Sequence, residues 1–424
     1  MLSFGGIIAI LAQTIYAWIH LHILHTLHTA SWNHGGASLG HCCNFATMNI
    51  GITCYPTYGG SGVVATELGK ELATRGHNVH FISYALPFRL NGFRQNIYFH
   101  EVELPDYPLF EVDLYSLSLT SKMVDVVLYD DLDILHVHYA IPHASSAYMA
   151  KLILNEQGRD IKIITTLHGT DITLIGLDPT MLPLVRFSIE KSDGITTVSR
   201  FLREKTLTNF NLDVPIEVIP NFVNIEEWKR QDGSCLRAQW APNGEKVLVH
   251  VSTFRPVKRV LDVVRTFDQI RKTTPSKLIM VGDGPDRAEA ERMCRELDII
   301  NDVIFLGKQT CLAEIFSASD LFLMPSQSES FGLSALEAMA CGLPALTSSV
   351  GGLPELNLHG TTGYICEIGD TDRMARYAID LLSHPKKYAQ FSTAARERAV
   401  KNFDAVDIVA KYEAYYERVL RGEK

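Results

Sequence analysis

The sequence predicts an α/β protein with two doubly wound, Rossmann-like domains that face each other across a cleft. Short apolar segments alternate with amphipathic helical segments, a pattern typical of a parallel sheet covered by helices. The alternation runs as two separate series, divided by a candidate linker at residues 220–224. A length of 424 residues provides enough material for the cores of two or three domains.

The first series begins with an apolar strand at residues 49–54, then a glycine-rich turn and a helix over residues 63–75. A second helix is expected over residues 144–154. The other strands of this series are expected at residues 78–83, 133–138, 161–167, 195–198 and 216–219. We assign residues 48–219 to a first domain and expect the C-terminal helix, within residues 404–424, to pack back on it.

The second series begins with a strand at residues 246–251. Its other strands are expected at residues 277–281, 303–306, 321–324 and 345–347. A helix over residues 372–382 follows them, and we assign residues 220–403 to a second domain. In doubly wound domains, ligands bind beyond the carboxyl ends of the strands, so the cleft between the domains is the expected site.

Residues 1–47 contain no Asp, Glu, Lys or Arg. Residues 2–24 are apolar and about long enough to span a bilayer, but they lack the positive flank of a signal peptide or an oriented anchor. We favour an uncharged N-terminal extension outside the fold over a membrane anchor. The segment has four closely spaced histidines without carboxylates, and we predict no metal site there; they are His20, His22, His25 and His28.

The composition excludes several classes of function. A net charge of −9 argues against a nucleic-acid-binding protein, because phosphate contacts need concentrated Lys and Arg. The eight cysteines show no Cys-x-x-Cys spacing, so we predict a reduced, intracellular protein without a zinc site. We expect a cytoplasmic protein rather than a membrane-associated one. The sequence leaves the oligomeric state open, a homo-oligomer included.

The stretch from Ser326 to Pro344 carries the strongest functional signal. Small hydroxyl residues precede a run of good helix formers, and Ser328 or Ser330 is expected to cap the helix. The free amides at such a helix start can hold a phosphate. Glu329 and Glu337 are eight residues apart, about 12 Å along a helix, roughly the span from a sugar across a diphosphate to a ribose. The alternative is an ordinary amphipathic helix with two solvated glutamates.

This stretch resembles the donor site of family-four retaining glycosyltransferases with the GT-B fold. The likeness covers the chain from Met48 to the C-terminus and is greatest for the branch of the family that uses malate as acceptor. Nine further segments match: 51–56, 59–62, 86–90, 96–102, 136–143, 166–171, 254–259, 281–285 and 306–309. Residues 1–47 have no counterpart.

The resemblance implies roles at the donor site. Glu329 would bind the sugar hydroxyls, Glu337 the ribose, and His168 would lie beside the transferred sugar. Lys258 and, less securely, Arg255 would stabilise the diphosphate leaving group, because the usual family arginine position is Thr253 here. The remaining donor-binding residues would be Gly60, Gly62, Gly282, Lys308, Phe331, Gly332 and Leu333. From the residues alone, the glycine runs could equally be turns, and a lone His168 could be structural.

The acceptor would be a small dicarboxylate. Ser61 and Tyr139 are expected to supply neutral hydrogen-bond donors from loops at the cleft. Arg186 interrupts an apolar helical stretch and is expected to bind a carboxylate. The alternative for Arg186 is a surface ion pair with Glu190, one helical turn away.

The reaction implied by the resemblance is transfer of N-acetylglucosamine from UDP-GlcNAc to the hydroxyl of L-malate, the first step of bacillithiol biosynthesis. The α configuration would be retained by front-face attack, with no protein nucleophile. No Asp-x-Asp motif occurs where GT-A enzymes bind a metal, so we expect no metal and no cofactor. The rivals are a membrane-associated glycosyltransferase of cell-surface glycans, a sugar-nucleotide epimerase and a non-catalytic nucleotide-sugar-binding protein.

Overall fold

The computed structural model describes residues 46–104 and 114–423. The chain from Thr47 onward forms one compact unit. The predicted N-terminal extension lies almost entirely outside the described residues.

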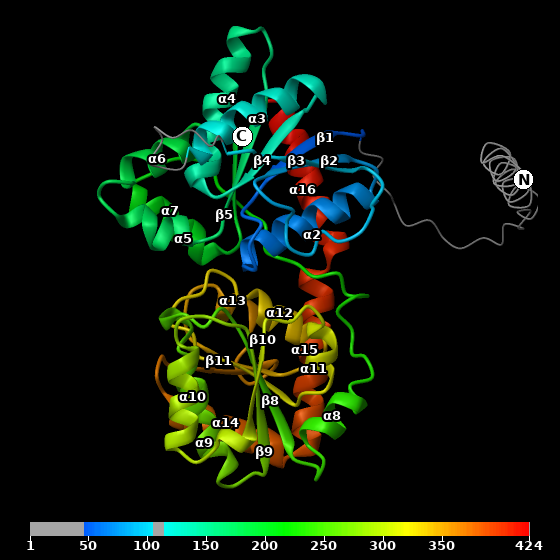
Figure 1. Cartoon of the computed structure of the whole chain (residues 1–424), viewed down its shortest axis with the longest axis vertical. Helices are drawn as coiled ribbons and strands as arrows, with labels where there is room; N and C mark the ends of the chain where they lie inside the picture. Colours follow the sequence, from blue (N-terminus) through cyan, green and yellow to red (C-terminus); the bar gives the residue numbers. More distant parts are fainter. Residues whose placement is uncertain (1–45, 105–113, 424) are drawn as a thin grey trace, which may run out of the picture. The chain divides into compact units, whose positions relative to one another are not determined.

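Two parallel sheets organise the unit (Figure 1). The first has the order β3-β2-β1-β4-β5-β6-β7, and the second has the order β10-β9-β8-β11-β12-β13. The strands of the first sheet are β1 (Asn49–Thr53), β2 (Asn78–Ser83), β3 (Ile97–Glu101), β4 (Ile134–His138), β5 (Lys162–Leu167), β6 (Gly194–Thr197) and β7 (Glu217–Val218). Those of the second are β8 (Lys246–Val251), β9 (Ser276–Val281), β10 (Val303–Gly307), β11 (Leu321–Met324), β12 (Ala345–Ser348) and β13 (Gly363–Cys366). The predicted α/β class with two doubly wound sheets is confirmed.

Helices cover both faces of the first sheet. They are α2 (Gly60–Thr74), α3 (Tyr115–Tyr129), α4 (Ser145–Glu156), α5 (Thr170–Thr173), α6 (Leu182–Glu190) and α7 (Arg200–Phe210). On one face α2 packs against β1, and on the other α3 and α4 pack together. The predicted helix over 63–75 starts three residues earlier, so its first turn contains the glycine-rich segment.

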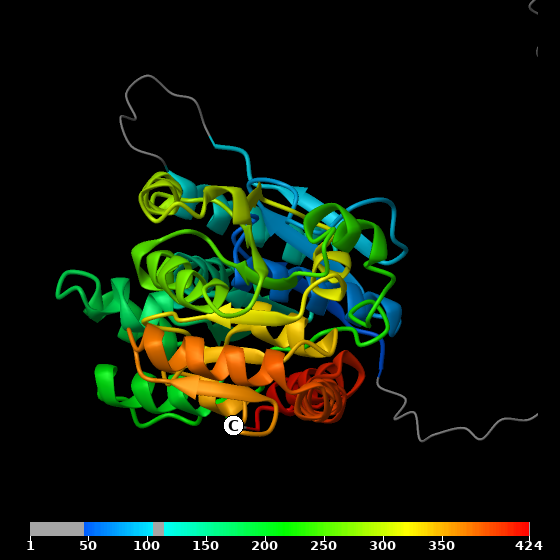
Figure 2. The same cartoon turned by 90° about the horizontal axis from the view of Figure 1, so that it is seen from below.

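Helices also cover both faces of the second sheet (Figure 2). They are α8 (Ser234–Trp240), α9 (Val260–Arg271), α10 (Arg287–Glu296), α11 (Leu312–Ser317), α12 (Leu333–Ala340), α13 (Leu353–Leu356), α14 (Thr371–Ser383) and α15 (Pro385–Phe403). One face carries α9, α10 and α14, and the other carries α11, α12 and α15. Strands buried on both faces explain the continuous apolar runs in the sequence.

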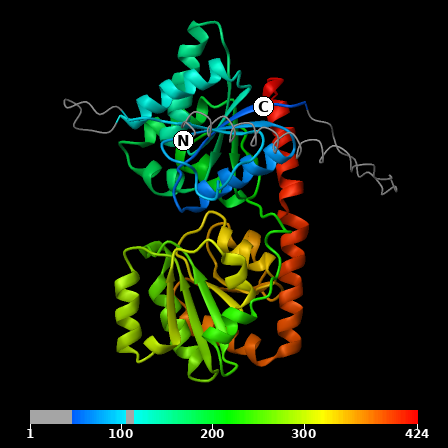
Figure 3. The ribbon, with the colours of Figure 1, turned by 45° about the vertical axis from the view of Figure 1, so that its right-hand side comes forward.

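The last helix, α16 (Ala405–Leu420), belongs to the first sheet although it follows the second in the chain (Figure 3). Its apolar residues Ile408, Tyr412 and Tyr416 recur every four residues and are completely buried or nearly so. Glu413 accepts a hydrogen bond from Arg75 at 2.7 Å, which ties α16 to the end of α2.

None of the helices within residues 46–104 and 114–423 combines the length and the apolar content needed to cross a bilayer.

Candidate active site

The predicted site residues cluster where parallel strands end. Gly60, Ser61 and Gly62 follow β1, Tyr139 follows β4, and His168 follows β5. In the second sheet the corresponding residues follow β8, β9, β10 and β11; they are Arg255, Lys258, Gly282, Lys308, Glu329, Phe331, Gly332 and Leu333. The carboxyl edge of a doubly wound sheet is where its ligands bind.

Helix α12 begins with a glycine rather than with a capping serine. Gly332 occupies the N-cap with φ 98°, and within the described residues no side-chain cap hydrogen bond is found there. The expectation that Ser328 or Ser330 caps this helix is therefore wrong. The backbone turns too sharply for an ordinary cap, and the carbonyl of Ser330 instead accepts a hydrogen bond from Ser199. The uncapped helix start leaves amide donors for an anion.

A short ion pair stands in front of this helix start. Lys258 Nζ lies 2.6 Å from Glu329 Oε1, and Ser326 Oγ donates to the same oxygen at 2.9 Å. The Glu329 side chain is only 11% exposed and that of Lys258 22% exposed. Solvent screens the charges of such buried side chains only weakly, so the attraction between Lys258 and Glu329 is strong. The structure thus brings together two of the four predicted catalytic residues.

Glu337 is paired with an arginine to which the sequence assigned no role. Arg89 Nη1 donates to Glu337 Oε1 at 2.9 Å, and the Arg89 guanidinium lies 5.2 Å from the centre of the Trp228 ring. Burial raises the pKa of the Glu337 carboxyl, and the pairing with Arg89 opposes that rise. Oε1 is occupied by Arg89, which leaves Oε2 for a ligand. An arginine in the apolar segment 86–90 was the available signal, but the sequence does not reveal its partner.

His168 is held by a second histidine. His138 Nδ1 lies 2.8 Å from His168 Nε2, and within the described chain the buried His138 Nε2 has no partner. A buried N–H without an acceptor is costlier than an unfilled lone pair, so we assign the His138 proton to Nδ1. His168 Nε2 then accepts, and the proton of His168 lies on Nδ1. Burial lowers the pKa of His168 to about 3, so the ring is neutral at pH 7.

The His168 loop touches the donor loop of the second sheet. A Cβ on Gly169 would lie 1.8 Å from Ser330 Oγ, so only glycine allows this approach. Ser330 is the neighbour of Glu329. The loops that carry the predicted sugar-binding residues His168 and Glu329 are therefore in contact.

Tyr139 and Ser61, each predicted as a neutral donor to the acceptor, bond to each other on the first domain. The Tyr139 hydroxyl donates to Ser61 Oγ at 2.9 Å, and its ring lies 5.5 Å from the His168 ring. Burial raises the pKa of Tyr139 to about 12, so it remains a neutral donor.

Three side chains predicted to bind substrate as cations are more exposed than those described above. Arg255 and Lys308 are exposed, and no hydrogen bond or ion pair of their side chains is found within the described chain. Arg186 Nε donates to Glu190 Oε1 at 3.0 Å, and its side chain is 44% exposed. This is the alternative ion pair considered from the sequence, and the role of Arg186 toward an acceptor stays a prediction.

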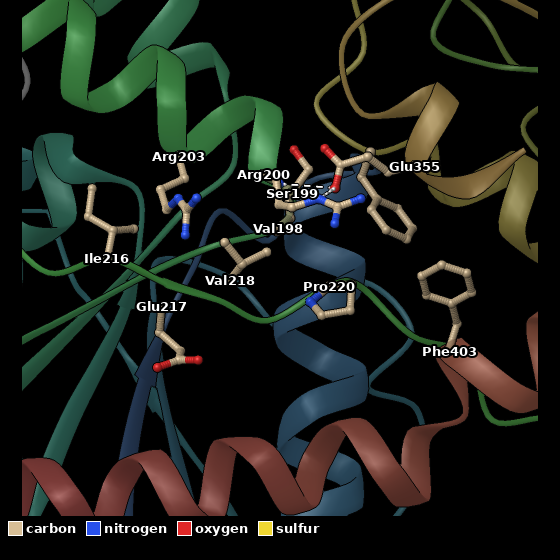
Figure 4. Close-up of a pocket in the computed structure, with 11 residues that line it drawn as sticks. Val198, Ser199, Arg200, Arg203, Ile216, Glu217, Val218, Pro220, Glu355 and Phe403 are labelled. Atoms are coloured by element: carbon tan, nitrogen blue, oxygen red, sulfur yellow. Dashed lines mark hydrogen bonds and ion pairs between the residues drawn. The ribbon is translucent and has the colours of Figure 1, made fainter.

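A separate pocket of about 480 Å³ lies beside this cluster (Figure 4). Arg203 and Glu217 line one side of it and Phe403 the other, while Arg200 pairs with Glu355 at its rim. Phe331 is the one residue that this pocket shares with the predicted site.

The two halves of the chain match two glycosyltransferase families. Residues 58–227 match Glycosyltransferase Family 4, and residues 236–398 match Glycosyl transferases group 1. N-acetyl-alpha-D-glucosaminyl L-malate synthase of Bacillus anthracis is 48% identical over 89% of this chain and 98% of its own. The chain belongs to the family-four glycosyltransferases. It is a glycosyltransferase enzyme, and the predicted family is confirmed.

Solved structures confirm the GT-B fold of this family-four enzyme. Sucrose-phosphate synthase from Thermosynechococcus elongatus superposes with a TM-score of 0.74 at 20% identity, covering 89% of this chain and all of that one. HepE of Anabaena, solved with UDP and glucose, superposes with a TM-score of 0.71 at 20% identity, covering 87% of this chain and 99% of that one.

Proposed function

We propose that this glycosyltransferase transfers N-acetylglucosamine from UDP-GlcNAc to the hydroxyl of L-malate, with retention of the α configuration. This would be the first step of bacillithiol biosynthesis. The name of the Bacillus anthracis relative and its 48% identity support the choice of substrates. The observation that carries the donor assignment is the buried Lys258–Glu329 pair in front of the uncapped start of α12.

The donor binds along α12. Glu337 Oε2 accepts from the ribose hydroxyls, and the amides of Phe331, Gly332 and Leu333 face the diphosphate. Gly282 has φ 124°, and a Cβ there would lie 1.8 Å from the carbonyl oxygen of Ser252, so the turn stays narrow beside the uracil. Lys308 borders the base.

The chemistry rests on charge that appears as the glycosidic bond breaks. The leaving UDP gains negative charge, and Lys258, with Arg255 at the rim, stabilises it more in the transition state than in the ground state. Glu329 and neutral His168 hold sugar hydroxyls, so the anomeric carbon faces the acceptor. The malate hydroxyl attacks the same face and passes its proton to the departing phosphate.

We propose that catalysis needs no metal or cofactor, because these cations supply the charge that a metal would supply. We place the reaction in the cytoplasm. The six cysteines within the described residues are unpaired, which fits a reducing compartment.

Acceptor identity is tested by UDP release from UDP-GlcNAc with L-malate, D-malate, succinate or inositol phosphate. L-malate should support turnover, whereas succinate should give nothing because it lacks the accepting hydroxyl. Turnover with inositol phosphate and none with L-malate would overturn the malate assignment and leave the donor assignment standing. Conversion of UDP-GlcNAc without any acceptor would indicate an epimerase.

The role of Arg186 is tested against a matched surface arginine. Arg186→Ala should raise the KM for L-malate tenfold or more while leaving the KM for UDP-GlcNAc unchanged, because a carboxylate loses a charge-assisted contact. Arg292 also lies on a helix surface and pairs with Glu296 at 3.6 Å, so Arg292→Ala is the control. Equal KM values for the two variants would assign Arg186 to its ion pair with Glu190 alone.

A further inference from the structure

Three metal-ligating side chains converge at the edge of the first sheet. His80 lies on β2, His100 on the edge strand β3, and Asp130 directly follows α3. His80 Nδ1 and His100 Nε2 are 3.0 Å apart. The Asp130 carboxylate lies 3.8 Å from each of these nitrogens, Oδ1 facing His80 and Oδ2 facing His100.

The sheet register creates this arrangement. Tyr98 pairs with His80 across the two strands, and His100 lies two residues farther along β3. Side chains two residues apart share a face of a sheet, so His80 and His100 emerge together on the face that α3 covers. Tyr98 stacks on His80 with ring centres 4.7 Å apart and restrains the imidazole.

Hydrogen bonding accounts for only part of this geometry. The two rings can share one hydrogen, but 3.8 Å is too long for a hydrogen bond from either ring to Asp130. Within the described chain, no hydrogen bond to the Asp130 carboxylate is found, although it faces two imidazole nitrogens at equal distances. A carboxylate in this position fits an ion that all three groups would share.

The distances suit a tetrahedral transition-metal ion. Nitrogen and oxygen ligands at about 2.0–2.1 Å from zinc lie about 3.3 Å from one another in a tetrahedron. The two nitrogens are 3.0 Å apart, each lies 3.8 Å from a different Asp130 oxygen, and one ligand atom from each residue lies within 4.8 Å of the others. A rotation of the Asp130 side chain that brings one oxygen closer to both nitrogens would complete the site.

We propose that His80 Nδ1, His100 Nε2 and Asp130 bind a divalent ion of the zinc class. Two imidazoles with one carboxylate select zinc, cobalt or nickel over magnesium or calcium. Neutral imidazoles supply the lone pairs, with their protons on the opposite ring nitrogens. The side chains of His100 and Asp130 are 22% and 34% exposed, so a water molecule can take the fourth position.

The ion has a structural role. β2 and β3 lie on the far side of β1 from β4 and β5, which carry Tyr139 and His168 at their carboxyl ends. Metal binding would tie the edge strand β3 to β2 and to the end of α3. It would stabilise the folded state in proportion to its affinity and leave the sugar-transfer chemistry unaffected.

The test uses the full chain, stripped with a chelator and titrated with ZnCl2 against a chromophoric chelator. Six histidines precede the described residues and can bind zinc, so the measured quantity is the difference between variants; they are His20, His22, His25, His28, His34 and His41. His100→Gln and Asp130→Asn should each bind one equivalent fewer than the unaltered protein. His384→Gln is the matched control, because His384 Nδ1 lies 3.3 Å from Asp380 without a second imidazole, and it should lose none.

Co2+ provides a second readout. The unaltered protein should show visible d–d bands of four-coordinate cobalt that Asp130→Asn lacks, together with a zinc-dependent rise in Tm that the variant also lacks. The Asp130 side chain is partly exposed, and within the described chain it accepts no hydrogen bond from the backbone. Asp130→Asn should therefore fold even if His100→Gln does not. Equal zinc equivalents in Asp130→Asn and the unaltered protein would overturn the proposal. Sugar transfer is measured on the chelated protein as well. Activity there would show that the transferase assignment holds whether or not the metal proposal does.

Discussion

At the scale of single residues, the proposed donor site contains buried charges that neutralise each other. Lys258 pairs with Glu329, and Arg89 pairs with Glu337. Under the proposed function, a nucleotide sugar would redirect these contacts toward its own hydroxyls and phosphates. Removing one partner leaves a buried charge uncompensated, which costs more than the loss of a surface pair.

Substitutions at these pairs should separate binding from turnover. Lys258→Ala and Glu329→Gln should lower kcat by roughly two decades or more, because their contacts change as the bond breaks. Glu337→Ala should mainly weaken UDP binding, because the ribose does not change during the reaction. Steady-state kinetics and UDP titration measure both quantities.

Lys272 offers the control for Lys258. It pairs with Asp268 at 2.5 Å, but its side chain is 62% exposed. Lys272→Ala should leave kcat and UDP affinity unchanged. If Lys258, Glu329 and Glu337 variants lost binding and turnover to the same degree, the separate roles proposed for them would be wrong.

At the scale of elements, the start of α12 depends on a glycine. Gly332 has φ 98°, and a Cβ there would lie 2.5 Å from Cδ2 of Leu353, which is completely buried. A larger residue would have to shift both the turn and the packing of α13. The phosphate-binding amides would then lose their alignment.

Gly332→Ala should therefore reduce UDP affinity at least tenfold and destabilise the fold by about 1–3 kcal/mol. Gly360→Ala is the matched control, because Gly360 has φ 74° and a Cβ there would have no neighbour within 4 Å. The control should show the backbone strain alone, about 1 kcal/mol, with UDP affinity unchanged. Chemical denaturation and UDP titration measure these effects, and an unchanged UDP affinity in Gly332→Ala would contradict the role of this turn.

At the scale of the whole molecule, buried neutral histidines make the fold sensitive to acid. His136, His138, His143 and His250 are completely buried. Burial lowers the pKa of His136 to about 3, lowers those of His143 and His250 to about 4, and lowers that of His138 well below its usual range. In the unfolded chain each has a pKa of about 6.5. The unfolded state therefore binds more protons than the folded state in this window.

The difference in bound protons sets how the free energy of unfolding changes with pH. Stability from these groups is complete above pH 6.5 and is lost as the pH falls from 6.5 toward 4. Burial raises the pKa of Asp171 to about 6, which adds one folded-state proton at pH 5 and offsets one histidine. These five groups together then take up about three protons on unfolding at pH 5, or roughly 4 kcal/mol per pH unit. His168 and His80, whose pKa values burial lowers to about 3 and about 4, add to the uptake in the same direction.

Isothermal chemical denaturation between pH 7 and pH 5 measures this slope. His250→Gln removes one of the four histidines and should lower the uptake by about one proton. A free energy of unfolding that stays flat from pH 7 to pH 5 would contradict the neutral state of these rings.

Much of this architecture is local information that the sequence carries by itself. Short apolar runs, helical runs with period 3.6 and glycines at helix ends predict most strands and the two-sheet class, because each signal depends on neighbouring residues. The glutamate pair around Ser-Phe-Gly likewise identifies the family, and the donor site predicted from it stays a prediction. The family likeness also pointed to Lys258, His168, Ser61 and Tyr139 one by one, without their contacts.

Only the tertiary structure decided which groups meet. The Arg89–Glu337 pair joins residues 248 positions apart, and the His138–His168 bond joins the ends of two strands. The prediction of a capping serine is wrong because Gly332, with φ 98°, is the N-cap of α12, and its close approach to Leu353 of α13 depends on long-range packing. The edge cluster of His80, His100 and Asp130 depends on strand register and on where α3 ends. Such contacts depend on long-range packing, and spacing along the chain does not encode them.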